Sequence, residues 1–328
     1  MLNLIDLFDS LESLPSTAEN YFSAVPIIGY EQHRLGKDAK GKPLVLISTV
    51  AEPTNQTWPA PVVLEHLKVI HHVECRIIRP DGTTESGKFT LIKCRSHDYY
   101  LHHYFLRVLS NVILFLKNTP SQQEITQAIN KLIELFRAIT KLPQKSVQGL
   151  WGELFLIAQS RKPIVLVDAW HTHPEERYDF ASLNQRIEVK SVGGRLRQHH
   201  FSLEQLNPPV GTDVLVASMF VERSQGGKSI IDLYEKIRSR IRRQPNLLLH
   251  LEQVIASTLG SSWPTSEERF DYKLAKQSLH FFEVAIIPSI SPDLPVGVSN
   301  VRFKSDLTGI PPIDLASYRE KGRLFGAI

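Results

Sequence analysis

The sequence predicts a protein of the α/β (α+β) class, and three observations lead to this prediction. Short apolar runs bounded by turn residues, typical of strands, dominate the first third of the chain and return after residue 160. Between them, helical segments repeat apolar residues every three or four positions. The chain has 328 residues, 42% of them hydrophobic and 22% charged, which is the composition of a folded protein with two or three domains.

The balance of charge and hydropathy narrows the possible locations and partners. Lys and Arg number 38 against 34 Asp and Glu, giving a net charge of +4. This small excess allows nucleic-acid binding without indicating it. No apolar run approaches the roughly 20 residues that cross a bilayer, and acidic residues follow the start too closely for a signal peptide. We therefore expect a cytoplasmic protein with no membrane partner.

A β-rich N-terminal domain is expected over residues 1–118. Two strand-like runs, Val73–Arg79 and Lys88–Cys94, flank the turn signal Pro80-Asp81-Gly82 and predict a hairpin. Its two cysteines, one in each strand, are expected to be buried thiols that can face each other across the hairpin. Residues 99–116 carry apolar side chains at helical spacing, which predicts a helix at the end of this domain.

A core domain is expected over residues 119–245, where helices precede a set of strands and a further helix follows it. The helices are predicted at residues 121–140, 146–159 and 230–243, and the strands at 178–181, 186–192, 200–203 and 214–221. The last strand is apolar throughout, which predicts burial on both faces. Residues 246–328 form a mixed, proline-punctuated C-terminal region to which the sequence assigns no chemistry.

One predicted helix carries an acidic residue in an otherwise apolar segment. From Leu150 to Ala158, every residue except Glu153 is apolar or glycine, so we expect a buried helix. A buried carboxylate needs a cation, a hydrogen-bond donor or a metal ion nearby. Glu153 is therefore either a structural acid paired inside the protein or a metal ligand, and the helix alone does not distinguish the two.

Two more carboxylates and a lysine occur in the strands that follow. Glu188 and Lys190 are two residues apart, so their side chains share one face of a strand. Turn residues at 182–185 predict a hairpin that places Asp179 beside Glu188. Such a set can hold Mg²⁺ through its carboxylates, while the lysine positions a water or stabilises a phosphate oxygen. The alternative is a surface strand with a common Glu-x-Lys pair.

These residues together resemble the active-site motif of a known superfamily. The similar segments are Gly149-Leu150-Trp151-Gly152-Glu153-Leu154, Ala169-Trp170, Asp179-Phe180, Ile187-Glu188-Val189-Lys190-Ser191 and Phe201-Ser202-Leu203-Glu204-Gln205-Leu206. Their order is similar to that of the PD-(D/E)XK nucleases, and more narrowly of bacterial PD-(D/E)XK motif proteins first described as a domain of unknown function. Tyr178 stands where the proline that names the motif would be.

The resemblance implies a restriction-endonuclease-like core, in which a mixed sheet is flanked by helices. Asp179 and Glu188 would hold the metal ion, with the backbone carbonyl of Val189 completing its inner shell. Lys190 would be the catalytic lysine, and Glu153 matches the helix glutamate that many members add to the metal site. The implied cofactor is Mg²⁺, for which Mn²⁺ can substitute.

Further polar residues follow the lysine strand. Gln205 matches a downstream glutamine of the narrower family and would orient a ligand or a phosphate. Arg195, Arg197, His199 and His200 are candidates for contacts with DNA phosphates, which position DNA without reading its sequence. A solvated basic loop is the alternative.

The histidines of the chain do not form a zinc pattern. His171-x-His173 has no partner at a spacing typical of zinc sites, and the adjacent histidine pairs point in different directions. The basic helix predicted at 230–243 suits either a DNA-tracking patch or a solvated surface.

We therefore expect a Mg²⁺-dependent DNA endonuclease that acts in restriction or anti-phage defence. DNA is the expected partner, together with a methyltransferase or other defence subunits, and a homodimer would suit cleavage of both strands. The alternative is a DNA-binding or assembly subunit of a defence complex, with a silent or conditionally active nuclease site. A third interpretation is an RNA or repair nuclease on the same fold.

Overall fold

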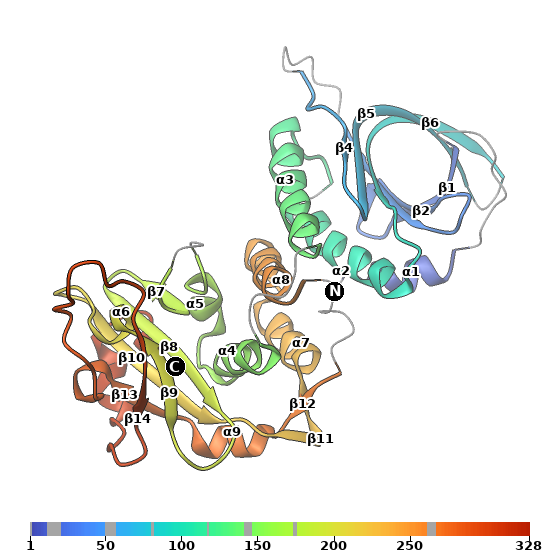
Figure 1. The fold of residues 1–328 in the computed structure, drawn as a ribbon. Coiled ribbons are helices and arrows are strands. Elements are labelled where there is room, and N and C mark those ends of the chain that lie inside the picture. Colours follow the sequence, from blue (N-terminus) through green and yellow to red (C-terminus); the bar gives the residue numbers. More distant parts are fainter. Residues whose placement is uncertain are drawn as a thin grey trace. The chain divides into compact units, whose positions relative to one another are not determined.

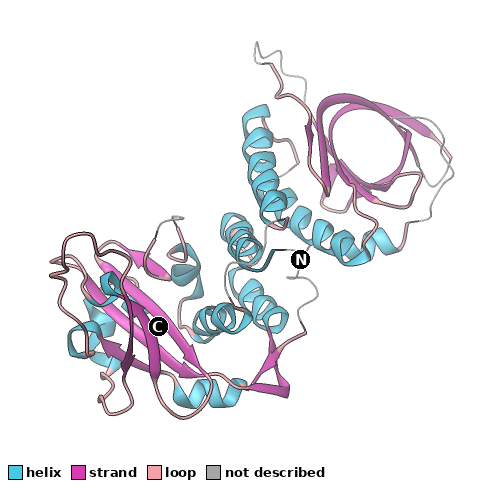
Figure 2. Ribbon diagram, viewed as in Figure 1, coloured by secondary structure: helices cyan, strands magenta, loops and turns pink. Residues whose placement is uncertain are grey.

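The computed structural model describes residues 2–11, 21–49, 57–79, 82–116, 118–140, 146–172, 176–260 and 267–328. The chain divides into two compact units (Figures 1 and 2). Unit 1 is Met1–Leu142 with Ile255–Thr265, and unit 2 is Pro143–Val254 with Ser266–Ile328. The domain limits at residues 118 and 245 stay a prediction. Among the described helices, none has the length and apolar character needed to span a membrane.

Unit 1 contains a sheet that curls until its strands meet (Figure 1). The described strands are β1 (Tyr21–Ile27), β2 (Tyr30–Lys37), β3 (Pro43–Ser48), β4 (Val62–Val63), β5 (Leu67–Ile78) and β6 (Thr84–Cys94). Their order is β1-β2-β3-β6-β5-β4, and β1 also pairs in parallel with β5, which closes the ring. The helices of this unit are α1 (Leu4–Asp9), α2 (Tyr99–Leu116) and α3 (Gln122–Ala138).

The local predictions for this unit are largely confirmed. β5 and β6 form the predicted antiparallel hairpin, although Pro80 and Asp81 of its turn lie outside the described residues. Both cysteines are buried free thiols, and burial raises the pKa of each to about 11. They do not face each other, because Cys75 pairs with Gly87 while Cys94 pairs with Leu67. α2 spans the predicted helix, and α3 begins after Ser121, whose side chain accepts from an amide of the first turn.

Unit 2 is a mixed sheet flanked by helices, as the predicted fold class requires. Its main elements are α4 (Val147–Gln159), α5 (Pro163–Asp168), β7 (Phe180–Ser182), β8 (Gln185–Val192), β9 (Gln198–Ser202), α6 (Leu203–Leu206), β10 (Asp213–Phe220), β11 (Arg223–Ser229), α7 (Ile230–Ile241), β12 (Arg269–Phe270), α9 (Tyr272–Ser278), β13 (His280–Glu283), β14 (Arg302–Asp306) and α10 (Leu315–Tyr318). Helix α8 (Pro245–Leu259) begins in unit 2, and its residues after Val254 belong to unit 1. Three short 3-10 helices follow β13 and α10, at Val284–Ile286, Arg319–Lys321 and Phe325–Ala327.

The central sheet of unit 2 has the order β13-β10-β8-β7. β8 runs parallel to β10 and antiparallel to β7, and β10 runs antiparallel to β13. The predicted burial of β10 on both faces is confirmed, since every residue from Val214 to Met219 is buried. The apolar run after residue 163 forms the short helix α5 rather than a strand, with Pro163 in its first turn, where proline is well tolerated.

The two faces of β8 are covered by different elements. α4 packs on the face of Val189 and Ser191, where a Cβ on Gly152 would lie 3.4 Å from the Ser191 Cβ, an ordinary packing distance. Alternation along the strand sends Glu188 and Lys190 to the opposite face. There the Lys190 Nζ lies 4.9 Å from the centre of the Phe201 ring on β9. One face of β8 is therefore covered by the buried helix α4, and the other face carries the polar side chains.

Candidate active site

Helix α4 carries Glu153 into the interior of unit 2. The Ser146 hydroxyl caps the helix by accepting from the Gly149 amide at 3.2 Å. Glu153 is only 3% exposed. Its Oε2 accepts from the indole Nε1 of Trp170 and lies within hydrogen-bond distance of the His171 Nε2, each at 2.8 Å. The buried carboxylate therefore has the indole N–H of Trp170 as a donor and the ring nitrogen of His171 as a second polar neighbour.

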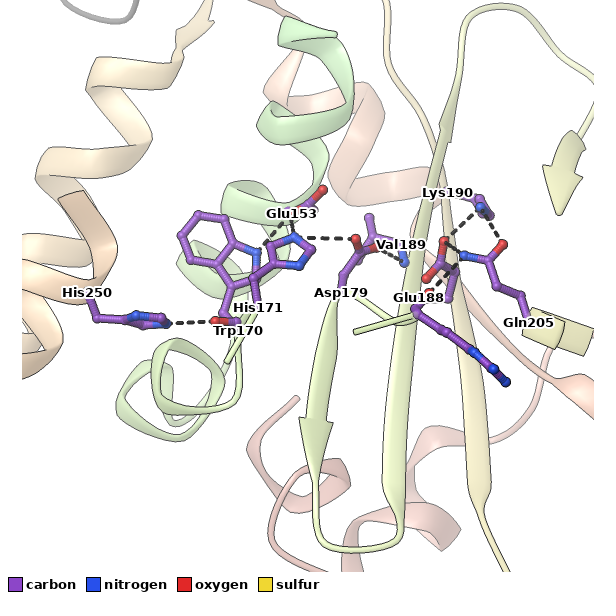
Figure 3. Close-up of polar contacts among 10 residues, drawn as sticks. Glu153, Trp170, His171, Asp179, Glu188, Val189, Lys190, Gln205 and His250 are labelled. Atoms are coloured by element: carbon purple, nitrogen blue, oxygen red, sulfur yellow. Dashed lines mark hydrogen bonds and ion pairs between the residues drawn. The ribbon is translucent and has the colours of Figure 1, made fainter. Parts of the chain in front are cut away.

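Asp179 lies directly before β7 and bonds across to β8. Its Oδ2 accepts from the Val189 amide at 2.8 Å, and its Oδ1 lies 3.6 Å from the His171 Nε2. The hairpin register pairs Phe180 with Ile187, so Asp179 reaches the strand beside Glu188, as the turn residues predicted. Asp179 is thus fixed at one carboxylate oxygen, while the other faces the histidine and Glu153 (Figure 3).

A second set of side chains gathers on the other face of β8. The Glu188 Oε1 lies 2.7 Å from the Lys190 Nζ and accepts from the Gln205 Nε2, also at 2.7 Å. Lys190 donates to the Gln205 Oε1 at 3.3 Å, which closes a triangle of polar contacts. Gln205 is held in place because it is also the capping partner of Ser202 at the start of α6.

The structure therefore brings the predicted residues into two adjoining sets. Glu153 and Asp179 form one set, and Glu188, Lys190 and Gln205 form the other. The backbone of Val189 joins them, because its amide holds Asp179 while its neighbours on either side are Glu188 and Lys190 (Figure 3).

Tyr178 occupies the position where the motif has its proline. Its hydroxyl donates to the carbonyls of Glu204 and Gln205, at 3.1 and 3.2 Å. Burial, reinforced by the nearby charge of Glu188, raises its pKa to about 12, so it remains a protonated donor. The tyrosine fastens α6 to the start of the hairpin and thereby supports the position of Gln205.

His171 is the site residue that the sequence did not reveal. Its backbone N–H donates to the Asp179 carbonyl at 3.1 Å, and the Ala181 amide donates to the Ala169 carbonyl at 2.8 Å. The segment before the site therefore pairs with β7 through a single antiparallel bridge between Trp170 and Phe180. Its companion His173 lies outside the described residues. No spacing rule could find His171, because its partners come from a helix and a hairpin rather than from a nearby repeat.

Two of the four residues predicted to contact DNA are buried, so that prediction is wrong for them. Arg197 donates to the Ser218 carbonyl at 2.8 Å and to its hydroxyl at 2.9 Å, and its guanidinium lies 4.7 Å from the Phe220 ring. The His199 Nε2 lies 2.7 Å from the same Ser218 hydroxyl. Burial, together with Lys190 and Arg197, lowers the pKa of His199 to about 3. Both residues are engaged inside the unit and are not presented to a phosphate.

The other two candidates, Arg195 and His200, are exposed. His200 lies on β9, which pairs with β14 so that His200 is opposite Lys304 and Ser202 is opposite Arg302. Lys304 and Arg302 are also exposed. The pairing therefore gives one face of this two-stranded ribbon a basic character. The sequence did not predict it, because β14 belongs to the C-terminal region that showed no chemistry.

The donor set of the first group suits a divalent metal ion. One oxygen from Glu153, one from Asp179 and a ring nitrogen from His171 all lie within 4.8 Å of one another. Carboxylates and imidazole are common metal ligands, and atoms at this separation can share one ion. The residues present therefore fit the cofactor that the motif implies.

Comparison with known proteins identifies the family. No curated protein and no solved structure matches the chain. Residues 4–308 match the family described as "Putative PD-(D/E)XK family member, (DUF4420)", so the match includes nearly all of both units. The chain therefore belongs to this PD-(D/E)XK family.

Proposed function

We propose that the protein is a metal-dependent nuclease that hydrolyses phosphodiester bonds in DNA. The observation that carries this proposal is the approach of two buried carboxylates, Glu153 and Asp179, beside the strand that carries Glu188 and Lys190. Acids gathered in this way repel one another and disfavour ionisation unless a cation is bound. Membership of the PD-(D/E)XK family supports the interpretation of these acids as a metal site.

The metal ion, Mg²⁺ or Mn²⁺, would be held by Glu153 and Asp179, while Glu188, on the other face of β8, would hold Lys190. When bound, such an ion lowers the pKa of a coordinated water and offsets the charge of a phosphate. Asp179 contributes a carboxylate whose orientation is set in advance by the Val189 amide. Preorganisation of this kind reduces the entropy lost when the site assembles around its substrate.

Lys190 and Gln205 act from the other face of the strand. The Lys190 ammonium is held between the Glu188 carboxylate and the Gln205 amide oxygen. From there it can orient a water or donate to a phosphate oxygen that accumulates charge. Gln205 fixes the Glu188 carboxylate through its amide N–H group, so its role is to position the acid.

The basic ribbon of β9 and β14 supplies a surface for the DNA backbone. Lys304, Arg302 and His200 are exposed on these two strands, and β9 leads directly into α6, which carries Gln205. Arg195 is exposed in the loop before β9. Cations beside a catalytic strand bind phosphates irrespective of base sequence. This favours a nucleic-acid substrate over a small phosphodiester.

The test is a cleavage assay with the purified full-length chain. Duplex DNA, single-stranded DNA and RNA are each incubated with Mg²⁺ or Mn²⁺ and the wild type, Lys190→Ala or Lys276→Ala. Lys276, exposed on α9, is the matched control. We expect cleavage of duplex DNA by the wild type and the control, and none by Lys190→Ala.

Other outcomes of this assay are equally informative. Cleavage of RNA alone would point to the RNA-nuclease interpretation. No cleavage of any substrate would favour a DNA-binding or assembly subunit. Cleavage by Lys190→Ala at the wild-type rate would contradict the proposed site.

The biological setting that we propose is restriction or anti-phage defence in the cytoplasm. A methyltransferase or another defence subunit would be the partner, and a homodimer would allow both strands to be cut. Expression in bacteria should then lower the efficiency of phage plating. Lys190→Ala should abolish this protection, and equal plating with and without the wild type would contradict the defence role.

A further inference from the structure

His171 faces the two acids of the first set from a separate segment of the chain. Its Nε2 lies 2.8 Å from the Glu153 Oε2 and 3.6 Å from the Asp179 Oδ1. The side chain is 22% exposed, whereas those of Glu153 and Asp179 are 4% and 9% exposed. The imidazole therefore stands on the open side of the two acids, where an ion arriving from solvent would meet it.

The backbone of His171 is held in an unfavourable conformation. Its φ angle is 42°, in the left-handed region that non-glycine residues seldom adopt. Such a conformation persists only where its surroundings enforce it, and it is concentrated at functional sites. Here the enforcing contact is the bond of its N–H to the Asp179 carbonyl at 3.1 Å.

The preceding residue is fixed just as firmly. Trp170 bonds through its indole to Glu153 at 2.8 Å and stacks on Phe180 with ring centres 6.5 Å apart. Its carbonyl lies 2.7 Å from the His250 Nε2 on α8 (Figure 3). These contacts set the direction of the imidazole before any ligand arrives, as a binding site requires.

A purely structural role for His171 explains less of this geometry. A histidine that only satisfied Glu153 would need one carboxylate oxygen and no strained backbone. Instead, the Nε2 of His171 lies near one acid from α4 and another from the start of the β7–β8 hairpin. The three possible ligand atoms all lie within 4.8 Å of one another. This is the arrangement expected when one cation takes the place between them.

We propose that His171 is a metal ligand, joining Glu153 and Asp179, and that its nitrogen makes this position prefer Mn²⁺ to Mg²⁺. Mg²⁺ favours oxygen ligands and keeps much of its water, whereas imidazole nitrogen suits first-row transition metals. The inference rests on the proposed metal-dependent function and names the ion that this site selects. Of these two ions, Mn²⁺ would then bind this position more tightly.

Metal binding tests the proposal without relying on cleavage. MnCl₂ and MgCl₂ are titrated by calorimetry into the chelator-treated full-length chain, as wild type, His171→Ala and His200→Ala. His200 is an exposed histidine of the same unit and serves as the control. We expect the wild type to bind Mn²⁺ at least about tenfold more tightly than Mg²⁺. His171→Ala should lose that preference, and His200→Ala should keep it.

A spectroscopic measurement on the wild type covers the case in which His171→Ala does not fold. Pulsed electron paramagnetic resonance of the Mn²⁺-loaded protein reports nitrogen bound to the ion. We expect a nitrogen coupling in the wild type and in His200→Ala. Mn²⁺ bound without nitrogen coupling, or a preference that survives in a folded His171→Ala, would overturn the role of His171 and leave the nuclease proposal standing. A wild type that binds neither ion would overturn both.

Discussion

Buried carboxylates occur in both units, and they serve different ends. In unit 1, the Asp38 Oδ1 accepts from the amides of Lys40 and Lys42 at 2.8 Å each, and its Oδ2 lies 2.7 Å from the Lys93 Nζ. Burial opposes its ionisation, but the bonds from Lys93 and the two amides outweigh this and hold its pKa below the usual value. Asp38 thereby closes the turn between β2 and β3.

In unit 2, the buried acids Glu153 and Asp179 approach each other instead. Glu153 and Asp179 share the imidazole of His171, and Asp179 reaches the strand of Glu188 through one backbone amide. The turn amides and the lysine that contact Asp38 stabilise its buried carboxylate, so its burial needs no functional reason. Two buried acids that approach each other gain no such stabilisation from one another, and this difference is why we propose unit 2 as the functional unit.

The strongest test of this contrast is removal of one charge from the cluster. Glu188→Gln keeps the size of the side chain but removes its charge and so weakens its hold on Lys190. We expect single-turnover cleavage to fall at least about 1000-fold, or about 4 kcal/mol in transition-state free energy, with little change in unfolding. Glu235→Gln on the exposed face of α7 should leave the rate unchanged. A loss smaller than about tenfold in Glu188→Gln would remove this acid from the site.

Unit 2 also contains charges that serve the fold, and Arg197 is the clearest. Replacing it with methionine leaves the carbonyl and hydroxyl of Ser218 without their buried donor. We expect the free energy of unfolding to fall by about 3 kcal/mol in urea titrations, while Arg195→Met changes it by less than about 0.5 kcal/mol. The folded Arg197→Met protein should bind DNA as the wild type does. Equal stability of the two variants would show that Arg197 is not a structural residue.

His199 is a second buried residue that serves the fold, and the pH dependence of the stability tests its role. Its folded-state pKa of about 3 lies below the ordinary value of 6.5. Between these values the unfolded chain binds a proton that the folded chain does not, so stability falls as the pH falls. From pH 7 to pH 5 this amounts to about 2 kcal/mol.

The measurement is urea unfolding at both pH values for the wild type and His199→Gln. The variant should lose that part of the acid sensitivity that His199 causes. An identical pH dependence in the two proteins would argue against a neutral, buried His199.

The smallest expected effect concerns the basic ribbon, whose cations are exposed. Exchanging both Arg302 and Lys304 for alanine should weaken DNA binding about tenfold and reduce the slope of log affinity against log salt by about two. Binding is measured by fluorescence anisotropy at several salt concentrations. An unchanged slope would place the DNA on another surface.

The sequence predicted many helices and strands of both units because their signals are local. Helix α2 repeats apolar residues at helical spacing, Ser121 and Ser146 occupy helix caps, and β10 is apolar throughout. Glu153 stood out as the one acid in an apolar helix. In each case the deciding interaction lies within a few residues, where spacing and side-chain type suffice.

The remaining features depend on contacts between distant segments. His171 reaches Glu153 only because residues 169–171 run along β7, and the basic ribbon exists only because β14 pairs with β9. Arg197 and His199 looked like surface cations by composition, yet Ser218 on β10 draws them inside. Neither periodicity nor motif spacing encodes such pairings.

The central claim is that the acids of unit 2 serve catalysis and that Asp38 of unit 1 serves the fold. Matched variants, Asp179→Asn and Asp38→Asn, test it through single-turnover cleavage and thermal unfolding measured on the same preparations. We predict that Asp179→Asn loses cleavage at least about 100-fold and keeps its unfolding temperature, whereas Asp38→Asn unfolds several degrees lower and still cleaves while folded. The reverse pattern, with a stable, inactive Asp38→Asn and an unstable, active Asp179→Asn, would contradict the account.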